Sequence, residues 1–181
     1  MHRLLAAGTV CLALLSVGVT AQTPQPYAGM ETRPIKALSE QQIADLRTGR
    51  GMSLALTAEL NGYPGPRHVL ELADQLNLSP QQLQNVKRLF EEMTAEAVAL
   101  GQTLITRETE LDGQFAKRSV SLESLSSAMA VIGQAQAELR KTHLKYHLLT
   151  TALLTHQQLH RYSQLRGYTG SDQGHGPSHG N

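Results

Sequence analysis

Histidines recur in pairs along this chain, at a spacing that could bind a metal ion. His143 and His147 are four residues apart, so on a helix their side chains would share one face, an arrangement that holds zinc or copper. Glu96 is the carboxylate expected beside them if the helices in this region pack antiparallel. The competing interpretation is a partly buried, structural His143 that is hydrogen-bonded to Glu96 or to a backbone group.

The other histidines are weaker candidates. His156 and His160 repeat the same spacing, but a position directly behind a helix cap predicts exposed side chains. His175 and His179 lie in a Gly/His tail that could bind copper, nickel or zinc weakly, or could be simple low-complexity sequence. The sequence thus requires no cofactor and leaves zinc, copper or nickel as alternatives.

Residue sets for catalysis are missing from the sequence. No serine occupies a Gly-x-Ser-x-Gly elbow, and the acidic residues are scattered along the predicted helices. Gly49-Arg50-Gly51 lacks the strand and the Lys-Ser/Thr ending of a phosphate loop. We therefore expect a protein that is not an enzyme.

The first 21 residues predict export. His2 and Arg3 precede an apolar run from Leu4 to Val19, and a small-residue site ends at Ala21, which is typical of a cleaved signal peptide. We expect a periplasmic protein without membrane insertion after cleavage. The only cysteine, Cys11, lies inside this signal, so the mature chain would have no thiol. The near-neutral charge argues against nucleic acid as a partner.

Beyond the signal, the sequence predicts one helical domain. Residues 22–38 contain several prolines and are expected to form a flexible arm, whereas residues 39–168 carry helical patterns and residues 169–181 form a disordered tail. Short helices are predicted over 40–47, 52–60 and 67–76. The fold class is all-α.

A long antiparallel hairpin is predicted over about 79–154. Apolar residues recur every three or four positions, first up to Phe115 and then from Leu122 onward. With a turn near Arg118, Leu104 faces Ile132 and Ala97 faces Leu139. The predicted seam residues are Leu83, Val86, Phe90, Met93, Ala97, Leu100, Leu104 and Leu111, facing Leu122, Leu125, Met129, Ile132, Gln136, Leu139, His143, Tyr146, Thr150 and Leu153.

A second apolar stripe predicts a surface that must be covered by something else. It lies beside the seam near the open end of the hairpin, and either flanking segments, a second subunit or a bound protein could cover it. A homodimer or a protein-binding surface is therefore expected. Its residues are Met52, Leu54, Leu56, Leu144, Leu148, Ala152 and Leu159.

Two similar motifs bracket the hairpin. The first is Leu78-Ser79-Pro80-Gln81-Gln82, and the second is Leu154-Thr155-His156-Gln157-Gln158. In each, the hydroxyl residue and the glutamine three positions later have capping-box spacing. The chain thereby resembles the Spy/CpxP family, whose signature is a repeated Leu-Thr-x-x-Gln box and which is grouped with the metal-resistance proteins ZraP and CnrX. The resemblance covers about residues 67–168.

This resemblance implies an all-helical periplasmic dimer that is induced by envelope stress. Family members act as ATP-independent chaperones, as adaptors of a sensor kinase, or as metal-binding modulators. The resemblance therefore implies unfolded proteins or a sensor protein in the envelope as partners. The chaperone members have a strongly basic concave face, whereas this chain has a net charge of only +1.

Overall fold

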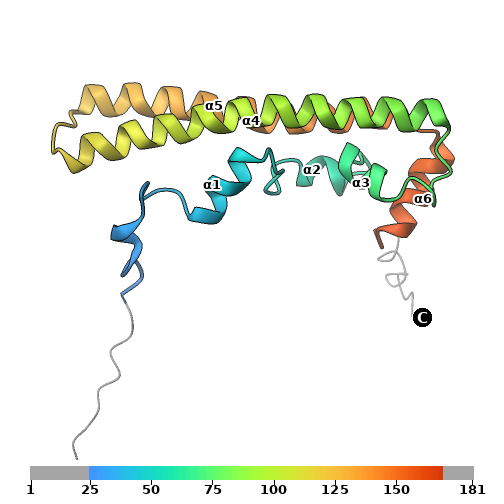
Figure 1. The fold of residues 1–181 in the computed structure, drawn as a ribbon, viewed down its shortest axis with the longest axis horizontal. Helices are drawn as coiled ribbons and strands as arrows, with labels where there is room; N and C mark the ends of the chain where they lie inside the picture. Colours follow the sequence, from blue (N-terminus) through green and yellow to red (C-terminus); the bar gives the residue numbers. More distant parts are fainter. Residues whose placement is uncertain (1–24, 169–181) are drawn as a thin grey trace, which may run out of the picture.

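Two long helices dominate the structure and pack against each other as an antiparallel hairpin. The computed structural model describes residues 25–168, and within that range the elements are η1 (Met30–Thr32), α1 (Glu40–Arg47), α2 (Leu56–Glu59), α3 (Pro66–Glu71), α4 (Pro80–Ala116), α5 (Leu122–Ala152) and α6 (His156–Leu165). The row α1, α2, α3 runs along one side of the α4–α5 hairpin toward its open end, where α6 turns away from the hairpin axis (Figure 1). The predicted all-α fold is confirmed. The predicted signal peptide, Cys11 and the Gly/His tail lie outside the described residues.

Side-chain caps fix where four of the helices begin. Ser39, Ser79, Ser121 and Thr155 each accept a hydrogen bond from the backbone amide three residues later, at 3.1–3.2 Å. In turn, a side-chain oxygen of each of these later residues accepts a hydrogen bond from the backbone amide of the capping residue. Two backbone donors are therefore satisfied reciprocally. Because such a box depends only on neighbouring residues, the first residues of α1, α4 and α6 follow from the sequence, whereas for α5 both Ser119 and Ser121 were possible caps and the structure has Ser121.

The middle of the hairpin holds the largest core cluster. Leu104 and Ile132, as well as Ala97 and Leu139, are buried in this cluster, as the predicted register requires. Ile35, Leu38, Ile43 and Leu46 complete the cluster from the N-terminal side. The flexible arm was predicted to extend to residue 38, but Ile35 and Leu38 are buried and anchor the chain to the core.

Gly101 of α4 lets α1 approach the hairpin. A Cβ placed on Gly101 would lie 3.0 Å from the carbonyl carbon of Leu46 and closer still to its oxygen. The end of α1 therefore rests directly on the backbone of α4, which only a residue without a side chain permits.

Two smaller clusters lie toward the open end. In the first, Val69, Leu76, Val86 and Tyr162 join α3, α4 and α6. In the second, Leu89, Met93 and Tyr146 join the two long helices. Together these clusters attach α6 and the α3 segment to the base of the hairpin.

The segment before α2 departs from the prediction. A helix was expected over 52–60, but α2 covers only Leu56–Glu59. Met52 and Ser53 adopt left-handed backbone angles, with φ of 42° and 62°, and so cannot belong to a right-handed helix. The predicted helix over 67–76 is likewise shorter and is observed as Pro66–Glu71.

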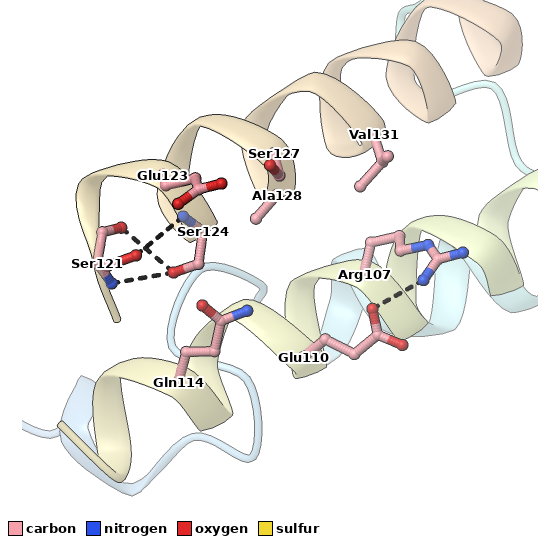
Figure 2. A pocket seen from close by; sticks show the side chains of 9 residues that line it. All are labelled: Arg107, Glu110, Gln114, Ser121, Glu123, Ser124, Ser127, Ala128 and Val131. Carbon is pink, nitrogen blue, oxygen red and sulfur yellow. Dashed lines mark hydrogen bonds and ion pairs between the residues drawn. The ribbon is translucent and has the colours of Figure 1, made fainter. Parts of the chain in front are cut away.

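The tip of the hairpin is exposed. The predicted seam residues Leu122 and Met129 are 85% and 51% exposed, and Gln136 is also exposed, so these three seam assignments are wrong. No residue from 106 to 131 is buried, and the N-terminal segment reaches this part of α4 through Lys36, whose Nζ lies 3.4 Å from Asp112 Oδ2. Figure 2 shows polar side chains between the two helices here, including Arg107, whose Nη1 donates to Glu110 Oε2 at 2.9 Å.

A helix that crosses a membrane must be both long and apolar. Within residues 25–168, none is both long enough and apolar enough to cross a bilayer.

Candidate functional site

The two predicted capping motifs meet at the open end of the hairpin. Gln82 Nε2 donates to Gln158 Oε1 at 2.9 Å, and Gln158 Nε2 donates to Gln82 Oε1 at 3.1 Å. The same amides also reach the carbonyls of Leu153, at 2.8 Å, and Leu76, at 3.3 Å. The glutamines thus cap their own helices and also fasten α6 to the start of α4.

The leucines of the two motifs have a packing role. Leu78 and Leu154 are half-buried against the cluster around Tyr162. The sequence identified Leu78, Ser79, Gln82, Leu154, Thr155 and Gln158 as two separate caps, and the structure joins them into one junction.

Glu59 is a buried carboxylate close to this junction, and it was not predicted as a site residue. Its side chain is 7% exposed and accepts hydrogen bonds from the Tyr162 hydroxyl, from the Tyr168 hydroxyl at 3.1 Å and from the Gly65 amide at 3.2 Å. Arg166 Nε lies 3.6 Å from the same carboxylate. Glu59 therefore ties α2 to α6 and to the residues that follow it.

Two imidazoles also face Glu59. His68 Nδ1 lies 3.4 Å from Oε1 without forming a hydrogen bond, and His147 Nδ1 lies 3.8 Å from Oε2. Burial alone would raise the pKa of Glu59, but the His68 imidazole and the hydrogen bonds from Tyr162 and Gly65 outweigh it and lower the pKa to about 2. Glu59 is thus a fixed negative charge at neutral pH.

The predicted metal residues do not converge. Glu96 is exposed and binds Lys145 Nζ at 2.6 Å and the Tyr146 hydroxyl at 2.8 Å. The Lys145 and Tyr146 hydrogen bonds lower the pKa of Glu96, in that order of strength. Among residues 25–168, no three His, Cys, Asp or Glu side chains are grouped so that they could hold a metal ion. The predicted set of Glu96, His143 and His147 is therefore not assembled.

His147 is occupied by protein groups. Its Nδ1 donates to the Tyr63 carbonyl at 2.7 Å, and the ring's other nitrogen is Nε2. A Cβ on Gly65 would lie 2.7 Å from that Nε2, so the backbone packs directly on this edge of the imidazole. His147 is therefore a packing residue that fixes the loop between α2 and α3.

His143 has a different environment. It is 2% exposed, and its Nε2 is buried without any hydrogen-bond partner. Burial, with a smaller contribution from His147, lowers the pKa of His143, so the ring is neutral at pH 7. The predicted alternative, a hydrogen bond from His143 to Glu96, is not formed, because no bond to His143 Nε2 exists and Glu96 faces Lys145 and Tyr146.

A cavity of about 360 Å³ lies between the residues that precede α3 and the hairpin. Glu59, His68 and His147 line it, with Arg166 and Tyr168. His143 lines the same cavity with a group of less polar side chains. These are Met52, Leu56, Phe90 and Met93.

The predicted protein-binding residues divide into two groups. Met52 and Leu54 are half-buried and pack against the central core cluster. Leu56 and Leu148 are 50% and 57% exposed, Ala152 is exposed, and Leu144 and Leu159 are half-buried. The flanking segments therefore leave Leu148 and Ala152 of the second stripe uncovered.

The remaining predicted histidines are outside these sites or outside the described residues. His156 and His160 are exposed on α6, as their position behind the cap suggests, and His175 and His179 lie outside the described residues. The chain was also compared with known proteins, and no family model, curated protein or solved structure matches it.

Proposed function

We propose that this protein is an exported envelope-stress protein of the Spy/CpxP type, which binds unfolded proteins or a sensor protein without ATP. The support begins with the two Leu-Ser/Thr-x-x-Gln motifs. They cap α4 and α6 and pair with each other through Gln82 and Gln158. The resemblance thus rests on residues that share one structural role.

The observation that carries the proposal is apolar surface left open beside α2 and α5. We call Leu56, Leu60, Leu144 and Leu148 the open-end surface. Leu56, Leu60 and Leu148 are each at least half exposed. Leu144 and Leu148 lie on the side of α5 next to His147, and α2 contacts α5. The exposed leucines of α2 and its end therefore lie on an element that contacts the helix carrying Leu144 and Leu148.

Apolar contact would supply the binding energy. Fully burying one leucine side chain contributes about 1.5–3 kcal/mol, so a few residues suffice for weak, reversible binding of an unfolded segment. The chain's net charge of +1 offers no strong electrostatic attraction. We therefore expect binding to depend little on salt concentration.

The test is suppression of aggregation of a chemically denatured client by the mature protein without nucleotide. We expect suppression by the wild type and its loss in a Leu56→Gln/Leu148→Gln variant. The matched control is Leu122→Gln, since Leu122 is more exposed but lies at the hairpin tip. No suppression at a several-fold molar excess would refute a general chaperone. Equal suppression by all three proteins would refute the open-end surface.

A homodimer could cover the same surface. Sedimentation velocity on the wild type and the Leu56→Gln/Leu148→Gln variant distinguishes the two uses. Dissociation of a wild-type dimer by these substitutions would assign the open-end surface to a second copy of this chain. A monomer in both cases would leave the surface free for client proteins.

A second candidate function, binding of a metal ion, is favoured by the buried and unpartnered Nε2 of His143. Calorimetric titration of the mature protein with zinc and with copper tests it. We expect copper binding that His143→Ala abolishes and that the exposed His156→Ala leaves unchanged. Binding that survives His143→Ala would place the metal elsewhere, for example on the tail histidines.

A further inference from the structure

A buried nitrogen and two sulfur atoms belong to side chains that line the same cavity. His143 contributes the unpartnered Nε2, Met93 is 7% exposed, and Met52 is half-buried. Met93 comes from α4, His143 from α5, and Met52 from the loop before α2. Three separate elements therefore bring potential ligands to one cavity.

The loop before α2 crosses both long helices at this point. A Cβ on Gly49 would lie 3.0 Å from the Thr94 carbonyl oxygen, and one on Gly51 would lie 3.9 Å from His143 Nδ1. Thr94 follows Met93, and Met52 follows Gly51. The loop thus passes beside His143 and the residue after Met93, and Met52 lines the same cavity as both.

The backbone of this loop is strained at the methionine itself. Met52 and Ser53 have φ of 42° and 62°, and the turn is closed by a hydrogen bond of 2.7 Å from the Leu54 amide to the Gly51 carbonyl. Left-handed angles are uncommon for residues other than glycine, and such strain is concentrated at binding and catalytic sites. A glycine at position 52 would remove the strain, but it would also remove the thioether.

We propose that Met52, Met93 and His143 form a binding site for Cu(I). This inference rests on the second proposed function, metal binding. Thioether sulfur is a soft ligand that selects Cu(I), and a neutral imidazole nitrogen also suits copper. The site differs from the predicted one, since it uses neither Glu96 nor His147.

The charges around the cavity favour a monovalent soft ion over a hard divalent one. Glu59 is the only carboxylate among the residues that line the cavity, and it is already engaged by Tyr162, Tyr168 and Gly65. Arginine side chains line the cavity as well, and their positive charge opposes a second charge on the ion. Zinc, calcium and magnesium would therefore lack the anionic ligands that they prefer.

Competition with a chromophoric Cu(I) chelator under anaerobic, reducing conditions tests the site on the mature full-length chain. We expect one tightly bound Cu(I) per chain. Met52→Leu and Met93→Leu keep the side-chain volume and should keep the fold. Each should weaken the Cu(I) affinity by at least roughly tenfold, the loss typical for removing even an outer-shell partner of a metal site. The matched control is Met129→Leu, at an exposed position of α5.

X-ray absorption spectra of the copper-loaded protein provide a second readout. We expect sulfur and nitrogen scatterers in the wild type and a loss of sulfur in the Met52→Leu/Met93→Leu variant. Cu(I) affinity that is unchanged by both methionine substitutions would overturn the proposed site. If zinc then still bound through His143, metal binding itself would stand, whereas no metal binding at all would refute both proposals.

Discussion

Replacing Glu59 by glutamine tests whether the buried carboxylate holds the open end together. The pKa of Glu59 falls from 4.5 to about 2 in the folded protein. Because a tenfold change in an equilibrium constant corresponds to about 1.4 kcal/mol, this difference is worth roughly 3 kcal/mol of folding free energy at neutral pH. We expect Glu59→Gln to lose about that much stability, measured by urea denaturation followed by circular dichroism.

The pH dependence gives the same prediction an independent check. Since the folded pKa is depressed, the stabilisation is complete above the ordinary pKa of 4.5 and is lost as the pH falls toward 2. The stability difference between wild type and Glu59→Gln should therefore narrow over this range and vanish below it. Titrating groups that do not contact Glu59 are common to both proteins and cancel in the comparison.

The matched control is Glu71→Gln. Glu71 is exposed and pairs with Arg67 at 3.0 Å, so its loss should change stability by less than about 0.5 kcal/mol. A Glu59→Gln variant as stable as this control at neutral pH would refute the reasoning. A stability difference that stays constant down to about pH 2 would refute the assignment of the effect to the Glu59 charge.

Two further predictions concern packing and capping, and urea denaturation measures both. Gly101→Ala should destabilise the protein by about 1–3 kcal/mol, because the new methyl group meets the Leu46 carbonyl, whereas Gly133→Ala has open space and should stabilise α5 by about 0.5–1 kcal/mol. A stabilising Gly101→Ala would contradict the close approach of α1. Gln82→Ala and Gln158→Ala should each lower the free energy of unfolding by about 1–2 kcal/mol. Because the two amides bond each other, the double variant should lose at least ~0.5 kcal/mol less than the sum of the two single losses. Strictly additive losses would mean that the amide pair contributes nothing beyond the two caps.

The parts of the fold that were predictable from the sequence depend on neighbouring residues or on a regular repeat. Capping boxes at Ser39, Ser79 and Thr155 gave the first residues of three helices, since donor and acceptor are only three positions apart. The repeat every three or four positions gave the hairpin and the register of its middle. It failed at the tip, where Leu122 and Met129 keep the apolar pattern but no other element covers the helix pair.

The candidate sites were harder to predict because their partners are distant in the sequence. Glu59 meets Gly65 six residues later, but Tyr162 and Tyr168 follow it by 103 and 109 residues. No local spacing indicates such contacts. The expected pairing of Glu96 with His143 is not formed. Glu96 instead bonds Lys145 and Tyr146, which lie on α5 only two and three residues after His143, so the sequence pattern could not tell these partners apart.

The lack of buried side chains from 106 to 131 has a consequence for how the molecule moves. Local opening there disrupts few apolar contacts, so its free-energy cost should be far below that of global unfolding. Amide hydrogens around the Lys117–Ser121 turn should exchange with deuterium fastest, and protection should increase stepwise along both helices toward Ala97 and Leu139. The hairpin would then behave as a stiff base with a fraying end, able to adapt its outer turns without releasing the junction at the other end.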